Sequence, residues 1–567
     1  MTSTLPITAC GESIEAALGD PFDAAGPMPA DAVLAADEMR RLADGAEDLL
    51  DTARLNAAFV PAALGGTLRS VPDLIGALRP VFARDASLGL GYGVTTLMAG
   101  LNVWTAGDAA QQASLANTIL DGGKVSVAYH ELDHGNDFSS NEMRAVESEG
   151  GYLLEGRKEV INNAHRASAA VVFARTDDRP GRSHSLFLVD LTDTTRTVGR
   201  LPRFPTTALR GVTLSGFDFD RHPVRTADLV GARGTGAEIA LRSFQVSRTV
   251  MASAGIGPVD MALHIASSFA AQRVLRGRTV DSLEHARTNI ALAHALLLAT
   301  DAMVGSVARR IHSNPDAVAT HTAAAKYLAP QLLEQAMEYL AVVLGARFYL
   351  RSGPSGLFGK HFRDVGPIGI GHAGGTSCLL SILPHLPRLT RDAETGTTAE
   401  HLFTPTTTGG DIPFDRLRIG VPVGDPYLAG LPSALAALHD AGSGGGGSVA
   451  TTARTLPAFG DAARGLARTE LGIDAGPRPM AVAARYCELL AIAAATGHHL
   501  VSPDPFTAVW ARLAVAAIEA RRTGLRPDVD IADVDTVFDE LTQRTRTGRS
   551  HCLDAAPVLR SIPQEKQ

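Results

Sequence analysis

The chain has 567 residues, enough for about three to five domains of ordinary size. Hydrophobic residues make up 45% and charged residues 20% of the sequence, which excludes a mostly disordered or fibrous chain. The net charge of -8 argues against nucleic-acid binding, because phosphate neutralisation needs a basic surface. Aromatic residues account for only 5%, so the core must consist of Ala, Leu, Val and Ile, which favours closely packed helices.

The spacing of the cysteines and the length of the apolar runs indicate in which cellular compartment the protein is expected. The four cysteines are far apart and form no C-x-x-C pair, so neither a disulfide framework nor a zinc ribbon is predicted. A lipobox-like Ile-Thr-Ala-Cys ends at Cys10, but neither a basic nor an apolar region precedes it. The most apolar stretch, residues 290–308, is interrupted by His294 and Asp301 and predicts a buried helix rather than a membrane span. We expect a cytoplasmic protein with no membrane partner.

The first half of the chain divides into two predicted domains. Over residues 30–122 apolar residues recur at helical spacing, with breaks at Pro61 and at Gly65-Gly66, which predicts an N-terminal helical domain. Over residues 123–232 short β-rich runs are separated by Gly, Asn, Asp and Pro, which predicts a central antiparallel β domain. These runs cover residues 125–129, 152–155, 169–173 and 185–189.

Helical spacing returns over residues 233–392. Its long segments, residues 237–271, 282–311 and 316–345, have lengths typical of a four-helix bundle. Residues 393–457 read as a linker, in which residues 395–410 and the GSGGGGS run at 442–448 are expected to be flexible. Residues 458–567 are rich in Ala and Leu and predict an appended helical domain. The predicted fold class is therefore α+β, mainly α.

Six local motifs, taken in chain order, resemble those of the acyl-CoA dehydrogenase superfamily. Residues 130–137 (HELDHGND) are similar to its Thr-Glu-Pro-x-Ala-Gly-Ser-Asp run, and residues 156–163 (GRKEVINN) to its Gly-x-Lys-x-Trp-Ile-Thr-Asn run. The strand VVFAR at 171–175 follows, and the segments over 209–236 lead into the bundle. Arg248 and Arg273 have the family's spacing, as do Arg363-Asp364 and the Gly-Thr-Ser triplet at 375–377.

The resemblance implies FAD bound between the β domain and the bundle. A flavin needs short polar donors and close backbone approach at its diphosphate, and polar contacts at the edge of its ring. The positions implied for these contacts are Tyr129, His130, Asn136, Val160, Asn162, Arg273 and Thr376, with Val160 standing where the family usually has Trp. Arg273 is implied to reach the diphosphate of a second subunit, so a homodimer or homotetramer is expected. The alternative for Asn136 and Asn162 is that they only close turns.

The catalytic positions depart from the family pattern. The family's glutamate base usually precedes the Gly-Thr-Ser triplet, where this chain has Gly374, and in a minority lies at the position of Ser247. Arg276 and Val342 also replace a Phe and a Gln of the family's flavin contacts. Removing a general base typically costs ~10²–10⁴-fold in rate, so simple β-oxidation is not expected.

Three kinds of chemistry remain compatible with Gly374. His372 has a suitable side chain for a substitute base, with a loop or core role as its alternative. Loss of CO2 from a β-keto acid needs no base, and a reduced-flavin monooxygenase of the same fold lacks the glutamate altogether. A non-redox acyl-binding or lyase-type descendant without flavin is a further alternative.

Two other motifs compete with this interpretation. HELDH at 130–134 matches the H-E-x-x-H pattern of zinc proteases, but that pattern requires a helix and here it follows a β run. Gly234-Thr-Gly236 lacks the third glycine of a dinucleotide fingerprint. No metal site is predicted.

The predicted function is a flavin-dependent oxidoreductase of specialised metabolism. Its substrate is expected to be an acyl thioester or a related acid, carried by CoA or by a carrier protein. Ser247 and Arg248 are expected beside the acyl group, and the Gly374 N–H is expected to bind the thioester oxygen, a contact that needs no side chain.

Overall fold

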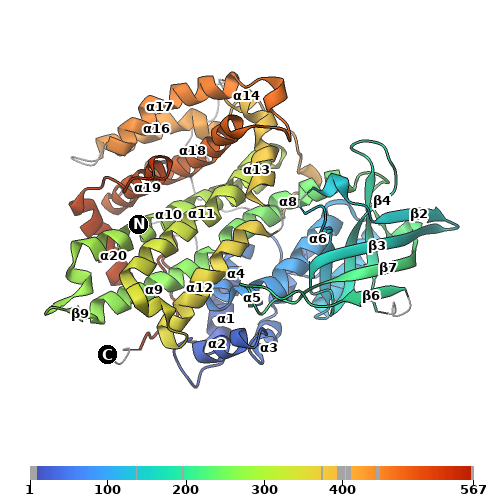
Figure 1. Cartoon of the computed structure of the whole chain (residues 1–567), viewed down its shortest axis with the longest axis horizontal. Helices are drawn as coiled ribbons and strands as arrows, with labels where there is room; N and C mark the ends of the chain where they lie inside the picture. The colour runs from blue at the N-terminus through green and yellow to red at the C-terminus, as the bar shows by residue number, and fades with distance from the viewer. Residues whose placement is uncertain are drawn as a thin grey trace.

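The structure is a computed structural model that describes residues 9–135, 137–192, 197–371, 374–391, 403, 410–441 and 447–563. A β-sheet lies at one end of the molecule, and N-terminal helices join it to a bundle of long helices (Figure 1). The C-terminal helices pack on the bundle away from the sheet. This arrangement confirms the predicted fold class of a mainly helical α+β protein.

The described residues before position 122 form helices α1 (Ala9–Leu18), α2 (Ala30–Glu38), α3 (Ala46–Thr52), α4 (Val71–Arg84), α5 (Ala86–Leu88), α6 (Thr95–Ala106) and α7 (Ala109–Leu120). Helix α1 precedes residue 30, where the predicted helical domain begins. Side-chain caps fix two helix starts: Ser70 Oγ accepts the Asp73 N–H at 3.1 Å before α4, and Asp108 forms a capping box with Gln111 at α7. Helix α6 is buried over all but its last residue and packs against the sheet and the bundle.

The sheet contains strands β1 (Lys124–Ala128), β2 (Arg144–Ser148), β3 (Gly151–Asn162), β4 (Ala167–Arg175), β5 (His184–Asp190), β6 (Val198–Leu201), β7 (Leu214–Arg225) and β8 (Leu229–Val230). Their order is β6-β7-β3-β2-β4-β5-β8, and β1 pairs with β4. The predicted β runs at 152–155, 169–173 and 185–189 fall within these strands, and the run at 125–129 matches β1 except for its last residue. β1 and β2 run parallel to β4, so the sheet is mixed and the prediction of a purely antiparallel sheet is corrected. The parallel pairs arise because the hairpin formed by β2 and β3 intervenes before β4.

The bundle consists of α8 (Gly236–Ser253), α9 (Ile256–Gln272), α10 (Glu284–Ser313), α11 (Ala319–Leu344) and α12 (Gly353–Ile370), followed by α13 (Gly375–Ile382) and α14 (Leu386–Leu389). The helix predicted over residues 237–271 is divided between α8 and α9. Near the division Gly257 allows close packing, because a Cβ there would lie 2.6 Å from the Arg79 carbonyl oxygen of α4. A short hairpin, β9 (Val274–Leu275) and β10 (Arg278–Thr279), joins α9 to α10.

The C-terminal helices are α16 (Pro426–Asp440), α17 (Gly447–Arg464), α18 (Pro477–Val501), α19 (Pro505–Thr523) and α20 (Ile531–Arg546). Helix α16 and the start of α17 lie inside residues 393–457, so helix replaces the predicted linker there. The physical reason is that Leu431, Leu435 and Leu438 have helical spacing and are buried, while Asp425 caps the helix start. Most of residues 395–410 and residues 442–446, expected to be flexible, lie outside the described residues.

In the part of the chain that the structure describes, three helical stretches are long and apolar enough to cross a membrane by length and composition alone: Gly236–Gln272, Glu284–Ser313 and Pro477–Val501. Their most apolar windows are 100%, 94% and 67% buried against the rest of the protein. The apolar character of these helices is therefore used in the core, as predicted for residues 290–308.

After α20 the chain forms a segment without regular helix, residues 547–563, that crosses the bundle and reaches α1. We call it the C-terminal strap. Its backbone N–H groups bind carboxylates: that of Leu559 bonds Glu15 at 3.0 Å, and that of Ser561 bonds Asp20 at 2.7 Å. The strap thus joins the two ends of the described chain.

Candidate functional site

The HELDH sequence at residues 130–134 forms a turn after β1 and contains no helix. Glu131 is 7% exposed and accepts hydrogen bonds from Lys158 Nζ at 2.7 Å and from two backbone N–H groups of the following loop. Burial alone would raise the pKa of Glu131, but the charge and hydrogen bond of Lys158 lower it. Glu131 is therefore an anion that fixes this turn to β3, and the absence of a helix excludes a zinc-protease site here.

Tyr129 and His130 directly follow β1, and Tyr129 lies beside α6 and α8. The Tyr129 hydroxyl donates to Asn102 Oδ1 of α6 at 2.5 Å, and burial raises the pKa of this phenol well above its usual value. His130 Nδ1 donates to the Glu159 carbonyl at 3.1 Å. The Tyr129 ring packs at centroid distances of 5.5–5.9 Å against Phe138, Phe173 and Phe244. These polar side-chain atoms thus have partners within the chain, so a ligand here would meet backbone atoms.

Strand β3 positions Val160 and Asn162 next to the N-terminal helices. Val160 has a φ of +58° and lies at a β-bulge, where the pairing with β7 shifts register. A β-branched residue in this left-handed region stores roughly 1–3 kcal/mol of strain, and such strain is concentrated at functional sites. Asn162 Nδ2 donates to Thr95 Oγ1 at 2.8 Å and to the Leu90 carbonyl at 3.2 Å. Its amide therefore fastens the sheet to the helices.

Ser247 and Arg248 lie in α8, 2% and 5% exposed. Arg248 Nη2 donates to Ser381 Oγ of α13 at 3.5 Å, whereas its buried Nε has no hydrogen-bond partner among the described residues. Gly374 is the N-cap residue of helix α13 and has no side chain to cap it, and Thr376 in the first turn of this helix is exposed. Arg248 thus joins α8 to the helix that follows Gly374.

The structure brings some of the predicted residues together and separates others. Phe244 contacts both sides of the site, because its ring centroid lies 5.9 Å from that of Tyr129 and 5.5 Å from the Arg248 guanidinium carbon. The end of β1 and the start of the bundle therefore share one region. Asn136 and His372 lie outside the described residues.

A buried lysine that the sequence patterns did not single out lies close to this region. Lys326 of α11 is 1% exposed, and its Nζ donates to the carbonyls of Ile368 and Gly369 at 2.7 and 3.0 Å. Burial lowers the pKa of Lys326 to about 8, and the charge of Arg248 adds to this effect. Lys326 therefore holds the end of α12, from which the chain continues to Gly374. Its sequence signal is a lone charge in the apolar run AAAKYLA.

A second buried charge cluster fixes the middle of α12. Lys360 Nζ donates to Asp85 Oδ1 at 2.6 Å and to Asp364 Oδ2 at 2.8 Å, and Arg363 Nε donates to Asp364 Oδ1 at 2.9 Å. Asp364 also accepts a backbone N–H from the loop before β7 at 2.8 Å. Burial alone would raise the pKa of Asp364, but these two cations lower it to about 2. In this chain the Arg363-Asp364 motif therefore positions α12 against the N-terminal helices and the sheet.

Arg273 lies at the other end of the bundle, where α9 meets the hairpin of β9 and β10, far from the sheet (Figure 1). Its half-buried guanidinium has no hydrogen bond or ion pair with another described residue. Arg276 and Gly277 form the hairpin loop with φ of +50° and +79°, as in a type I′ turn. Val274 and Leu275 are 46% and 44% exposed. Arg273 and these apolar side chains thus face outward, away from the Tyr129 region of the same chain.

The cations and free hydrogen-bond donors of the chain fit the diphosphate of a flavin dinucleotide. A diphosphate needs cations and unpaired N–H groups, and the chain offers the Arg273 guanidinium and the uncapped start of α13. The orphaned Nε of Arg248 marks a buried donor that lacks an acceptor. The Tyr129 hydroxyl and the Asn162 amide are already bonded, so contacts to the ring edge near them must come from backbone atoms.

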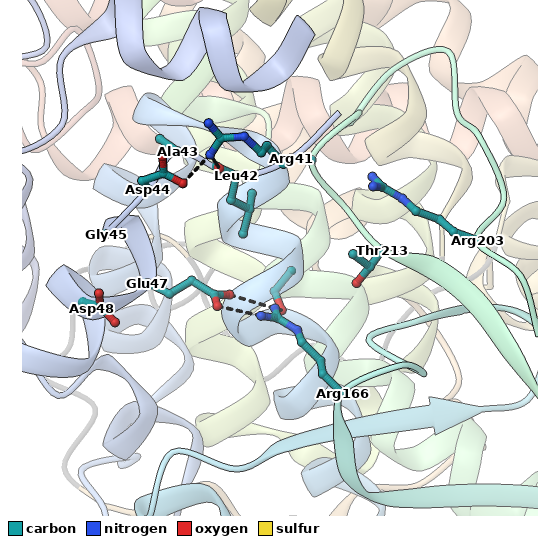
Figure 2. Close-up of a pocket in the computed structure, with 12 residues that line it drawn as sticks. Arg41, Leu42, Ala43, Asp44, Gly45, Glu47, Asp48, Arg166, Arg203 and Thr213 are labelled. Carbon is teal, nitrogen blue, oxygen red and sulfur yellow. Dashed lines mark hydrogen bonds and ion pairs between the residues drawn. The ribbon is translucent and has the colours of Figure 1, made fainter. Parts of the chain in front are cut away.

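A separate cavity of about 350 Å³ lies between the N-terminal helices and the sheet (Figure 2). Figure 2 shows Arg41 close to Asp44 and Arg166 close to Glu47, and Arg166 makes a bidentate ion pair with Glu47 at 2.6 and 2.7 Å. Arg203 approaches from the opposite wall. None of the predicted site residues that the structure describes lines this cavity, and most of its charges are paired.

Two family models match the chain. The model described as "Acyl-CoA dehydrogenase, middle domain" matches residues 126–222, and "Acyl-CoA dehydrogenase, C-terminal domain" matches residues 234–382. An acyl-CoA dehydrogenase of Bacillus subtilis is 30% identical over 223 residues, which cover 39% of this chain and 58% of the relative. The human short-chain specific acyl-CoA dehydrogenase is 25% identical over 313 residues, covering 55% of this chain and 74% of the relative.

Solved structures show the same fold over about two thirds of the chain. Butyryl-CoA dehydrogenase from Megasphaera elsdenii has a TM-score of 0.61 at 20% identity, covering 66% of this chain and 97% of its own. PigA with FAD and proline has a TM-score of 0.59 at 19% identity, covering 67% and 97%. The prolyl acyl carrier protein oxidase AnaB has a TM-score of 0.59 at 17% identity, covering 67% and 98%. These structural matches show the fold, and the two family models together with the sequence relatives identify the chain as a member of the acyl-CoA dehydrogenase superfamily.

Proposed function

We propose that this chain is an FAD-dependent oxidoreductase that acts on an acyl thioester carried by CoA or by a carrier protein. Superfamily membership supports the cofactor and the class of reaction. The neighbours named as a prolyl acyl carrier protein oxidase and as a protein for biosynthesis of a methoxymalonyl extender unit support a carrier-bound substrate in specialised metabolism.

Gly374 is the main reason to propose a reaction that differs from ordinary acyl-CoA dehydrogenation. It is the N-cap residue of α13 and stands where the family usually has its base, and neither it nor Ser247 supplies a carboxylate. When bound, the cofactor supplies the acceptor for a hydride from the substrate. The chain binds the thioester oxygen through the N–H of Gly374, while Arg248 holds α8 against α13.

The reaction must therefore generate the substrate enolate without a carboxylate base at these two positions. Loss of CO2 from a β-keto acid does this directly, and His372 is the alternative base. A reduced-flavin monooxygenase is the second candidate, because the reaction of the reduced cofactor with oxygen needs no base for an α-proton. A glycine at position 374 is therefore as compatible with this reaction as with loss of CO2. Incorporation of ¹⁸O from O2 into the product identifies the monooxygenase, whereas anaerobic bleaching of the flavin by substrate identifies the dehydrogenase.

The visible absorbance spectrum of the purified protein, with and without added FAD, tests the cofactor. We expect flavin bands that remain with the protein after gel filtration. A colourless protein that fails to retain FAD would overturn the redox proposal and leave the acyl-binding or lyase-type descendant.

The variant Gly374→Glu tests the position of the missing base. It is expected to raise dehydrogenation of a simple acyl-CoA by on the order of 10²-fold, the lower end of a general base contribution. Gly374→Gln, which has nearly the same size and no carboxylate, is the matched control and should give no gain. Equal rates for the two variants, in protein that binds both flavin and thioester, would show that residue 374 does not face the substrate α-carbon.

We also propose that a second copy of the chain completes the flavin site. The exposed Val274 and Leu275 and the unpaired Arg273 support this, because they lie at the end of the bundle far from their own sheet. Light scattering after size exclusion is expected to give a dimer or tetramer. A monomer that binds FAD tightly would contradict the proposal.

A further inference from the structure

A histidine-rich cluster is buried where the C-terminal strap crosses the bundle. Asp260 and His264 lie one turn apart on α9 and so share a face, and His551 lies in the strap. Their exposed fractions are 1%, 1% and 0%. The site joins residues that are 291 positions apart in the sequence, which is why no local motif predicts it.

The three side chains place one ligand-type atom each within 4.8 Å of one another. Asp260 Oδ1 lies 3.1 Å from His551 Nδ1 and 3.9 Å from His264 Nε2, and the two imidazole centroids are 4.0 Å apart. Ligand atoms of a tetrahedral zinc ion with bonds of about 2.1 Å are separated by roughly 3.4 Å. The two measured separations lie on either side of this value, so small side-chain rotations would create the ligand geometry.

His264 has one nitrogen without a partner at the centre of this cluster. Its imidazole donates to the Arg549 carbonyl, while the buried Nε2 has no hydrogen-bond partner among the described residues. Donation to a carbonyl fixes the proton on the other nitrogen, so Nε2 presents a lone pair towards Asp260. A backbone carbonyl in this role is typical of histidines that bind metals.

His551 is held towards the cluster in a different way. Its Nδ1 and its backbone N–H donate to Asp260 Oδ1 at 3.1 and 2.7 Å, and its Nε2 lies 3.0 Å from Thr545 Oγ1. A metal ion bound here would take the place of the Nδ1 proton, so that Nδ1, His264 Nε2 and Asp260 Oδ1 face one another as ligand atoms.

We propose that Asp260, His264 and His551 bind one divalent transition-metal ion of the zinc class and thereby fasten the C-terminal strap to α9. Two imidazoles and one carboxylate suit Zn²⁺, whereas Ca²⁺ and Mg²⁺ prefer all-oxygen sites. Arg560 Nη1 binds Asp260 Oδ2 at 2.8 Å, which holds the carboxylate with Oδ1 towards the two histidines. This site lies on the strap side of α9 and takes no part in the proposed flavin chemistry.

Metal analysis of the full-length protein tests the site. We expect about one zinc per chain by mass spectrometry, and after chelation we expect Co²⁺ to give the visible absorbance bands of a tetrahedral complex. Chelation should lower Tm by about 3 °C or more, and added Zn²⁺ should restore it. Wild-type protein that contains no metal, gives no Co²⁺ bands and has the same Tm with and without Zn²⁺ would overturn the proposal and show an ion-pair network only.

The variant His264→Gln is expected to lose the metal and the response of Tm to chelator. His321→Gln is the matched control, because His321 is also buried but bonds Asp425 at 3.0 Å, away from the strap. It should keep the metal. A His264→Gln protein that retains full zinc content would refute this ligand assignment, and the wild-type Co²⁺ spectrum decides the question if the variant does not fold.

Discussion

Replacing Lys360 by methionine tests whether the buried charge cluster on α12 stabilises the fold. Lys360 is 3% exposed and bonds Asp85 at 2.6 Å and Asp364 at 2.8 Å. In the variant Arg363 still pairs with Asp364, whereas Asp85 loses its cation and keeps the Ser87 N–H at 2.8 Å. Removing one partner of a buried ion pair costs about 3–5 kcal/mol, so we expect the free energy of unfolding to fall by this amount.

Urea unfolding followed by far-ultraviolet circular dichroism measures the effect in Lys360→Met, Asp85→Asn and the double variant. Asparagine keeps the capping oxygen of residue 85 but removes the uncompensated charge, so the double variant should recover about half of the loss or more. A loss below about 1 kcal/mol in Lys360→Met, the value of an exposed pair, would refute the reasoning. So would a double variant no more stable than Lys360→Met.

Three further predictions follow from the same structure. Because the pKa of Asp364 is depressed to about 2, its contribution to stability is present above its unfolded pKa, near 3.8, and is lost as the pH falls towards 2. The stability difference between wild type and Asp364→Asn should therefore shrink by about 2 kcal/mol over that range in acid unfolding curves, and a constant difference would count against it. Gly216→Ala should destabilise the chain by about 1–3 kcal/mol, because its Cβ would lie 2.2 Å from the Lys158 carbonyl oxygen. Gly199→Ala, where the nearest atom lies at 3.5 Å, should change Tm little, and equal effects of the two would contradict the packing argument. Arg273→Ala should weaken FAD binding by on the order of 10-fold in a fluorescence titration, as expected for losing one cation–phosphate contact, and an unchanged affinity would remove Arg273 from the site.

The regular elements of this fold were predictable because their signals are local. The runs at residues 169–173 and 185–189 lie within β4 and β5, and the segment 282–311 matches α10 to within two residues at each end. Periodicity of apolar residues reports which face is buried, whatever that face packs against.

The charged core was not predictable because each partner lies far away in the sequence. Lys326 bonds carbonyls more than forty residues later, and Asp260 meets His551 across most of the bundle and all of the C-terminal helices. The resemblance to the family pointed to Arg363-Asp364 but did not show that this pair holds α12 against the N-terminal helices and the sheet. The composition of the predicted linker was misleading in the opposite way. Pro426 stands in the first turn of α16, where helices tolerate proline, and Gly430 and Pro432 lie inside a helix that the buried leucines stabilise.

The hydrogen bonds from the strap to Glu15 and Asp20 have a consequence for synthesis of the chain. Their partners, Leu559 and Ser561, are translated more than 540 residues later. At about 5–20 residues per second this delay is roughly 30–110 s. During that interval α1 must dock on α4 without these contacts, although the bundle can already form. The outer layer next to α1 is therefore completed only after the rest of the molecule has been made.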